Sequence, residues 1–305
     1  MCGIAGLFLK NKSLETQLGT LFSGMLDCMS SRGADSAGFA IYGSTAPAGF
    51  LKLTLQHPGS EFPWKQLSSE LKTRFGEELT MKTVSNHAIF IVRGEEAEIR
   101  KLLREYFPDV NIMSVGQRIE IMKETGLPCT VLERFGVRNM TGSHAVGHTR
   151  MATESAVTTA GSHPFSTGRD LCLVHNGSLS NHNRLREKLR REGISFQTEN
   201  DSEVAAGYLT WRLSLGDALD EALNHALEDL DGFYTFTIGT RDGFAVLRDP
   251  IACKPAVMAE TKDYVAMASE YRSLATLPGI EQARLWEPEP ATVYTWSVST
   301  GVNRG

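Results

Sequence analysis

Several features that mark other protein classes are missing from this sequence. It contains no run of about 18 apolar residues, so it predicts no membrane-spanning helix. The N-terminus lacks a basic segment followed by a long apolar stretch, which argues against a secretory signal peptide. Lysine and arginine number 31 against 36 acidic residues, and they form no basic run. We therefore expect neither a membrane nor a nucleic acid as a partner.

Cysteine is scarce and scattered. The 305 residues include 5 cysteines, which lie far apart and form no CxxC pair. An odd, dispersed set argues against a disulfide framework and against a structural zinc site. We accordingly expect no metal site, and we expect a reducing, cytoplasmic location in which most of these cysteines are buried apolar side chains.

The first cysteine is different because it is residue two. A small side chain after the initiator methionine favours removal of Met1, which would make Cys2 the N-terminal residue. Cys2 would then carry a thiol and a free α-amine, whose ordinary pKa values are about 8.5 and about 8, so the amine could act as the base of the thiol. The alternative is a cysteine without a role at the start of an N-terminal strand.

Composition and hydrophobic periodicity indicate a globular α+β protein. Hydrophobic residues make up 41% and charged residues 22% of the chain, without repeats or linker-like tracts. We expect a single domain over residues 1–305, with an additional α+β elaboration at about 56–140 that packs on the main body, docks a partner or merely decorates the surface. The patterns predict strands at 2–9, 39–42, 49–55, 83–93 and 170–174, and helices at 13–30, 95–106, 181–192 and 202–214.

Polar residues gather in a few short blocks. These blocks are SRGADSAG (31–38), GHTRMAT (147–153), SHPF (162–165), HNG (175–177) and NDSE (200–203). Each has an ordinary structural explanation when taken alone. Arg150 could be a surface cation, Asn176-Gly177 a hairpin-type turn, and Asp201 the N-cap of the helix that follows.

Taken together, the blocks supply what a free amino acid would need for binding. Arg150 is a planar bidentate donor suited to an α-carboxylate, and Asp201 is suited to an α-ammonium group. The side-chain amide of Asn176 beside the N–H of Gly177 would form a two-donor oxyanion hole. A thiol nucleophile at Cys2 would complete such a site.

In this combination and order, the blocks resemble the class II (N-terminal-cysteine) glutamine amidotransferases, which are Ntn hydrolases. The start CGIAG and the segments LRDPIACKP (247–255), ASE (268–270) and 290–296 extend the resemblance over nearly the whole chain. The resemblance implies a four-layer αββα sandwich with Cys2 at the end of a central strand. It also implies glutamine as the substrate.

The resemblance implies a role for each matching residue. Cys2 would be the nucleophile, with its own amine as general base and acid. Asn176 and Gly177 would hold the oxyanion. Arg150 would bind the carboxylate of glutamine, and Asp201 its ammonium group.

Further residues are assigned to the pocket by the same resemblance. Thr153 and His163 would line the pocket. Arg32 would contribute to substrate binding. Arg32 and Asp35 together would shape the loop near the nucleophile.

Two histidines, and three positions that differ from the usual family pattern, also need an interpretation. Because the family uses the N-terminal amine as base, we expect His148 and His175 to be structural. Ala34, Met151 and Ala252 stand where proline, an aromatic residue and glycine are common, and none of these departures removes a catalytic group.

The resemblance further implies a hetero-oligomer. Class II domains usually precede a synthase domain, but this sequence contains no Walker loop, GxGxxG motif or iron–sulfur cysteine cluster. We expect a glutaminase subunit that passes ammonia to separate synthase subunits, most similar to the amidotransferase subunit of glutamate-synthase-like complexes, including N-methylglutamate synthase. No cofactor is expected in this chain, whereas a flavin or iron–sulfur cluster would belong to partner subunits.

Two other functions remain open at the level of sequence. One is a non-catalytic, glutamine-binding regulatory subunit, which a retained Met1 would favour. The other is an Ntn hydrolase that acts on a different amide, against which the charges of Arg150 and Asp201 argue.

Overall fold

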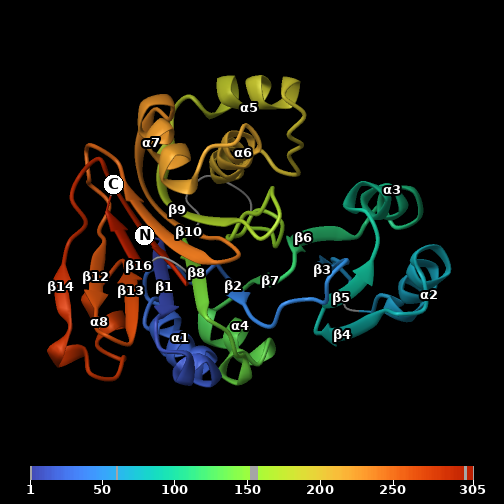
Figure 1. The fold of residues 1–305 in the computed structure, drawn as a ribbon, viewed down its shortest axis with the longest axis horizontal. Helices are drawn as coiled ribbons and strands as arrows, with labels where there is room; N and C mark the ends of the chain where they lie inside the picture. Colours follow the sequence, from blue (N-terminus) through green and yellow to red (C-terminus); the bar gives the residue numbers. More distant parts are fainter. Residues whose placement is uncertain (1, 60, 152–156, 299–300, 305) are drawn as a thin grey trace.

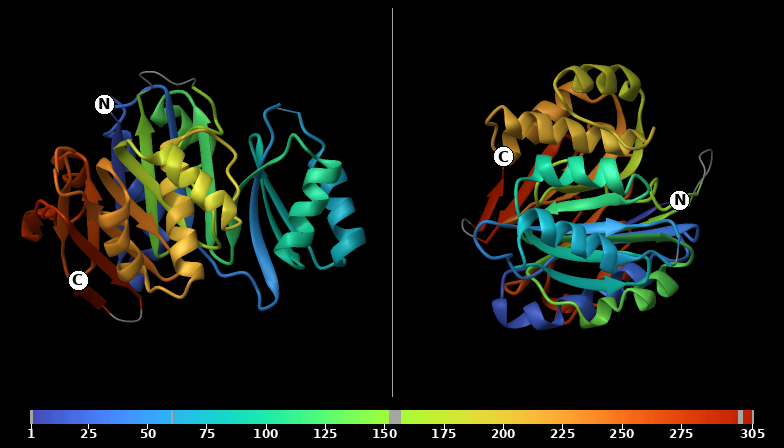
Figure 2. Two further views of the ribbon diagram at one scale, coloured as in Figure 1. Left: turned by 90° about the horizontal axis from the view of Figure 1, so that it is seen from above. Right: turned by 90° about the vertical axis from the view of Figure 1, so that its right-hand side faces the viewer.

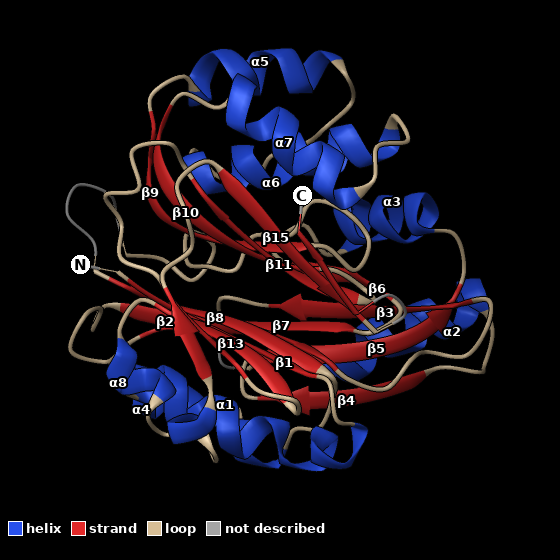
Figure 3. Cartoon of the chain, turned by 60° about the vertical axis from the view of Figure 1, so that its left-hand side comes forward, coloured by secondary structure: helices blue, strands red, loops and turns tan. Residues whose placement is uncertain are grey.

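Two stacked β-sheets form the centre of the molecule, and helices cover both outer faces (Figures 1 and 3). The computed structural model describes residues 2–59, 61–151, 157–298 and 301–304. Met1 and Thr153, both named above, lie outside these residues. This layering confirms the predicted αββα sandwich. None of the described helices is long and apolar enough to cross a membrane.

The first sheet has seven strands and carries the N-terminus. Its strands, in spatial order, are β14 (Arg284–Trp286), β12 (Val257–Glu260), β13 (Tyr264–Ala268), β1 (Gly3–Leu9), β8 (His144–Arg150), β2 (Ser36–Tyr42) and β7 (Ile119–Thr125). Its outer face is covered by α1 (Leu18–Asp27), α4 (Pro128–Arg134) and α8 (Tyr271–Leu274).

The second sheet has five strands. Their order is β16 (Gly301–Arg304), β15 (Thr292–Ser297), β11 (Gly243–Arg248), β10 (Gly232–Gly239) and β9 (Cys172–Leu179). Its outer helices are α5 (His182–Arg191), α6 (Asp201–Ser214) and α7 (Leu219–Asp229). Short 3₁₀ turns are η1 (Lys12–Gln17), η2 (Val137–Asn139) and η3 (Ile280–Gln282).

Strand β1 shows why the chain forms this sandwich. Its side chains alternate between two apolar layers, as expected for a strand buried on both faces. Ala5 and Leu7 pack in the layer beneath α1, whereas Ile4 and Phe8 pack between the two sheets. At Gly6, an added Cβ would lie 2.5 Å from the ring of Phe244, so the sheets approach closely there.

A separate four-stranded unit is inserted between β2 and β7. It runs β3 (Phe50–Gln56), α2 (Trp64–Phe75), β4 (Thr80–Val84), β5 (His87–Arg93), α3 (Glu96–Tyr106) and β6 (Asn111–Gly116). The strand order β4-β5-β3-β6 is that of a ferredoxin-like βαββαβ unit with its own apolar core. Figure 2 shows this unit beside the main body, with α2 and α3 on its outward side.

The bounds of this insertion differ from the segment of about 56–140 expected from sequence. Its first strand already begins at Phe50. Strand β7, which includes the polar segment around Met122–Gly126 as far as Thr125, pairs with β2 in the main sheet, and α4 packs against α1.

Two other elements also depart from the predicted pattern. The helix expected at 13–30 is the 3₁₀ turn η1 followed by α1. The strand expected at 83–93 is a hairpin of β4 and β5, because Ser85 turns the chain with a φ of 54°.

Candidate active site

Cys2 lies immediately before β1, an internal strand of the first sheet, at the end of the sheet where the neighbouring strand β8 also ends. It is partly buried, and its Sγ lies 3.8 Å from the carbonyl oxygen of Met151. The carbonyl oxygen of Cys2 accepts hydrogen bonds from Arg32 Nε at 3.0 Å and from Asn176 Nδ2 at 3.3 Å. A side chain from the loop before β2 of the first sheet and one from β9 of the second sheet therefore both bind the backbone of the predicted nucleophile.

Arg32 is hydrogen-bonded both to the predicted nucleophile and to Glu270. Besides its bond to Cys2, it donates from Nη1 to Glu270 Oε1 at 2.6 Å. The hydrogen bond from Arg32 and the charge of nearby Arg272 hold the pKa of Glu270 below its usual value, although burial opposes this. The geometry thus gives Arg32 a place in positioning Cys2, while its contact with substrate stays a prediction.

Asn176 and Gly177 lie within strand β9, so their interpretation as a hairpin turn is wrong. They pair with Thr235 and Tyr234 of β10. Gly177 has a φ of +154°, and an added Cβ would lie 2.0 Å from the carbonyl oxygen of Phe233. Only glycine fits at this position, which allows the backbone to approach β10 beside the side-chain amide of Asn176.

Arg150 is the last residue of β8 and is buried, so its interpretation as a surface cation is wrong. The loop before β2 wraps around its backbone. Asp35 N–H donates to the Arg150 carbonyl oxygen at 3.0 Å, and an added Cβ at Gly33 would lie 2.6 Å from the Arg150 backbone. The SRGADSAG block therefore holds the backbone of the predicted carboxylate-binding residue, and the pairing of β8 with β1 places that residue near Cys2.

Asp201 begins α6, and the N-cap of this helix is its neighbour Asn200. The Asn200 side chain accepts from Ser202 N–H at 2.9 Å. Asp201 Oδ2 instead accepts from the N–H of Leu179, at the end of β9, at 2.9 Å. This bond holds the Asp201 carboxylate at the start of α6, beside the strand that carries Asn176.

Two buried histidines bind Ser202, a residue that sequence analysis did not select, and a third packs against them. The Ser202 hydroxyl lies 2.8 Å from both His163 Nε2 and His175 Nδ1. His148 stacks on His163 with ring centroids 4.0 Å apart and directs Nε2 to the carbonyl oxygen of His175 at 3.1 Å. Burial lowers the pKa of His148 to about 3 and also lowers the pKa values of His163 and His175.

These imidazoles are therefore neutral near pH 7, and they support the segments on either side of the site. This arrangement agrees with the expected structural role of His148 and His175. His163 is buried in the same cluster. Its contact with glutamine stays a prediction.

Lys123, on β7, is a second residue missed by sequence analysis. Its ammonium group donates to the carbonyl oxygens of Ala160, Ser162 and Pro164 at 3.1, 2.7 and 3.2 Å. Burial lowers its pKa to about 7. Lys123 thus anchors the segment that carries His163.

A signal for Lys123 existed in the sequence. It continues the two-residue period of Ile119 and Ile121, whose side chains pack between the sheets. A lysine at such an apolar position indicates a buried amine with specific acceptors.

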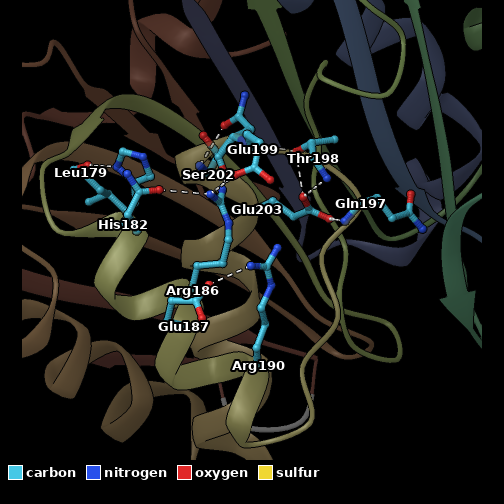
Figure 4. A network of polar contacts seen from close by, with 12 residues as sticks. Leu179, His182, Arg186, Glu187, Arg190, Gln197, Thr198, Glu199, Ser202 and Glu203 are labelled. Carbon is cyan, nitrogen blue, oxygen red and sulfur yellow. Dashed lines mark hydrogen bonds and ion pairs between the residues drawn. The ribbon is translucent and has the colours of Figure 1, made fainter.

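Arg186 supports the other side of the site. It is almost fully buried on α5, and it binds the Glu199 carboxylate and the carbonyl oxygen of Asn200, the latter at 3.2 Å (Figure 4). Both acceptors belong to the turn immediately before Asp201. Arg186 therefore holds the turn that presents the predicted ammonium-binding carboxylate.

Sequence comparisons point to one group of relatives. Residues 148–276 match the model of a glutamine amidotransferase domain. The chain is 59% identical over 297 residues to the glutamine amidotransferase-like protein GlxB of Rhizobium meliloti (strain 1021), covering 97% of this chain and 98% of that protein. It is also 28% identical over 198 residues to the amidophosphoribosyltransferase of Methanocaldococcus jannaschii, covering 62% of this chain and 42% of that enzyme.

A solved structure shares the fold. The glutamine phosphoribosylpyrophosphate amidotransferase from B. subtilis, complexed with ADP and GMP, aligns with a TM-score of 0.64 and 19% sequence identity. The alignment covers 100% of this chain and 49% of that chain. At this identity the likeness concerns the fold alone.

Proposed function

This chain belongs to the class II glutamine amidotransferases, and from that premise we propose that it hydrolyses the γ-amide of glutamine at Cys2 and passes the ammonia to a separate synthase subunit. The observation that carries the proposal is the 3.3 Å hydrogen bond from Asn176 Nδ2 to the Cys2 carbonyl oxygen. It brings the predicted oxyanion donor of one sheet to the predicted nucleophile of the other.

The proposed reaction begins after removal of Met1. The thiol proton of Cys2 passes to its α-amine, and the sulfur bonds to the carbonyl carbon of the side-chain amide of glutamine. The carbonyl oxygen becomes an oxyanion that Asn176 Nδ2 and Gly177 N–H stabilise. The α-ammonium group of Cys2 then protonates the amide nitrogen of glutamine, which leaves as ammonia. Water attacks the resulting thioester, releasing glutamate and the free thiol.

The charges around this centre support a free amino acid as substrate. Arg150 ends a strand beside Cys2, and a guanidinium group can bind a carboxylate through two parallel hydrogen bonds. Asp201 offers an anion for the α-ammonium group at the start of α6. We assign these two residues to opposite ends of glutamine.

We assign the acceptor chemistry to a partner in a hetero-oligomer. Each described helix and strand belongs either to the sandwich or to the βαββαβ unit, and the sandwich carries the predicted glutaminase site. By resemblance, the partner is a cytoplasmic synthase of the glutamate-synthase or N-methylglutamate synthase type. It would contribute the flavin or iron–sulfur cluster.

The glutaminase step is tested with a glutamine-mimicking electrophile followed by peptide mapping. We expect one adduct, on an N-terminal Cys2 that has lost Met1, and protection by glutamine. The Cys253→Ala variant is the matched control because Cys253 is also a free cysteine but is exposed, and it should be labelled at Cys2 like the native chain. Labelling at Cys253 or Cys129 in place of Cys2 would contradict the proposal.

The partnership is tested by purification from the native source. We expect co-elution with a larger subunit whose visible absorption reveals a flavin or an iron–sulfur cluster. Recovery of this chain alone, with full glutaminase activity, would contradict the partnership but leave the glutaminase assignment intact.

A further inference from the structure

Glu124 is a buried carboxylate that the proposed glutaminase reaction does not use. It lies near the end of β7, the last strand of the first sheet, between β2 and the βαββαβ unit (Figure 1). The residue is 8% exposed. Burial opposes its ionisation, but hydrogen bonds from Thr159, Thr125 and Asn86 hold its pKa below the usual value. A buried anion needs such donors, so the segments that supply them are held to it.

One oxygen of Glu124 binds a turn beside the glutamine site. Its Oε1 accepts from Thr159 Oγ1 at 2.5 Å, in the turn formed by residues 158–162. This turn lies next to the guanidinium group of Arg150, since a Cβ added at Gly161 would lie 3.8 Å from Arg150 Nη1. Glu124 therefore holds the turn that packs beside the predicted carboxylate-binding group.

The preceding residue of β7 holds the same turn from the other face of the strand. Lys123 and Glu124 are consecutive in a strand, so their side chains point to opposite faces. The ammonium group of Lys123 donates to the carbonyl oxygens of Ala160 and Ser162 at 3.1 and 2.7 Å. A cation on one face and an anion on the other thus hold the turn, and removing the anion leaves it bound from one side.

The other oxygen of Glu124 binds the βαββαβ unit. Its Oε2 accepts from Asn86 Nδ2 at 2.7 Å, at the turn between β4 and β5. Asn86 is fixed within the unit, because its Oδ1 lies 2.8 Å from Nδ1 of buried His87 and its carbonyl oxygen accepts from His57 N–H at 3.0 Å. Hydrogen bonds to an ionised acceptor are stronger than neutral ones. The carboxylate therefore joins the unit firmly to the 158–162 turn.

We propose that Glu124 is a positioning residue of the glutamine site, which holds the 158–162 turn against Arg150 and makes glutamine binding depend on the placement of the βαββαβ unit. Without this carboxylate the turn moves away from the guanidinium group, which then holds the α-carboxylate of glutamine less well. A shift of the unit changes the affinity for glutamine by the same route. The inference rests on the proposed glutaminase function and on the assignment of Arg150 to the α-carboxylate.

Substitutions at the two ends of this connection test the proposal. Glu124→Leu removes both bonds, and Thr159→Val removes only the bond to the turn while changing the packing less. We expect each to lower kcat/KM for L-glutamine about tenfold, through KM. Glu124→Gln can accept from Asn86 and donate to Thr159, so it should recover most of the loss. Asn86→Ala, which breaks the contact with the unit, should lower kcat/KM severalfold.

Glu120→Leu is the matched control for Glu124→Leu. Glu120 lies on the same face of β7 and also joins the main sheet to the unit, through Lys52 at 2.8 Å. Its partner is Lys52 of β3 rather than the turn, and the bond between Asn86 and Glu124 remains in this variant. Glu120→Leu should therefore leave kcat/KM for L-glutamine unaltered, even if it lowers the thermal stability.

A second substrate separates positioning of Arg150 from a general structural role. L-Glutaminamide has the same side-chain amide as L-glutamine, but an amide replaces its α-carboxylate. Because the effect acts through the carboxylate, Glu124→Leu and Thr159→Val should lower kcat/KM for L-glutaminamide by less than about twofold. Equal losses for the two substrates, or no loss for L-glutamine in either variant, overturn the positioning role. Native kinetics in Asn86→Ala overturn the dependence on the unit.

Calorimetry with L-glutamine on the Cys2→Ala background measures binding without turnover. Glu124→Leu and Thr159→Val should weaken this binding about tenfold, and Glu120→Leu should not. Unweakened binding in both of the first two variants overturns the inference even if the native chain is active. Failure of the proposed function appears differently, as a native chain without glutaminase activity. If Cys2→Ala also binds no glutamine, the inference is overturned with it.

Discussion

Arg32 donates a 3.0 Å hydrogen bond from Nε to the main-chain carbonyl oxygen of Cys2, although the two residues belong to different segments. Its Nη1 binds Glu270, two residues after the end of β13, so the guanidinium group links the nucleophile to the segment that follows the neighbouring strand. Precise placement of a nucleophile is worth a large factor in rate, since an error of about 1 Å can cost about 10²-fold.

Replacing Arg32 separates a positioning role from a substrate-binding role. For Arg32→Met we expect kcat for glutaminase to fall by about 10²-fold, with little change in KM, because the substitution displaces Cys2. Steady-state kinetics provide the measurement. Arg272→Gln is the control, since Arg272 also binds Glu270 but is half exposed. A raised KM with an unchanged kcat would instead identify Arg32 as a substrate ligand.

Replacing Arg186 should weaken glutamine binding without touching the chemistry. Arg186→Met releases the turn at Glu199 and Asn200, so the carboxylate of Asp201 is less well placed. We expect KM for glutamine to rise about tenfold, equivalent to about 1.4 kcal/mol, with kcat nearly unchanged. Arg190→Met, on the same helix with an exposed pair to Glu187, should leave both constants unaltered. Equal effects from the two variants would argue against this role.

Ala252 offers a way to stabilise the protein. Its φ of 52° lies in the left-handed region, at the position where the family resemblance leads us to expect glycine. A side chain in this conformation costs the folded state about 1–2 kcal/mol. Glycine has a greater conformational entropy in the unfolded chain, which offsets about 0.5–1 kcal/mol of the gain from removing the side chain. Ala252→Gly should therefore raise the free energy of unfolding by about 0.5–1 kcal/mol in denaturant titrations.

Ala275→Gly is the control for this substitution. Ala275 is exposed and has an ordinary φ of −61°, so the same change should destabilise the fold. If Ala252→Gly also destabilised it, backbone strain at Ala252 would be refuted.

Buried histidines should make the protein sensitive to mild acid. Burial lowers the pKa of His144 and His148 to about 3 and that of His87 to about 4. An unfolded histidine has a pKa of about 6.5, so the unfolded state takes up protons first as the pH falls. Stability is therefore complete above about pH 6.5 and declines below it, by about 1.4 kcal/mol per pH unit for each such histidine.

Urea titrations at about pH 7.5 and about pH 5.5 measure this loss. His144→Gln should lose less stability between the two values, because it removes one histidine that must stay neutral. Glutamine can still donate to the carbonyl oxygen of Thr240, which His144 contacts at 2.8 Å. His225→Gln, a surface substitution, serves as the control. An unchanged pH dependence in His144→Gln would contradict the explanation.

Local sequence patterns were enough to predict the family and most of the helices and strands. The N-terminal cysteine and the ordered blocks around Arg150, Asn176-Gly177 and Asp201 pointed to the family, and the four-layer sandwich followed from that resemblance. Periodicity placed most helices and strands it selected to within a few residues. It failed where one segment contains two elements, as at β4 and β5, and it gave no sheet order for the insertion.

The sequence by itself determined which chemical groups are present, and in what order, because these are properties of the chain. Tertiary structure alone decided which groups meet. The bond between Arg32 and Cys2, the histidines around Ser202 and the three carbonyls at Lys123 all join distant segments. Such contacts depend on how sheets and helices pack, and no local spacing encodes them.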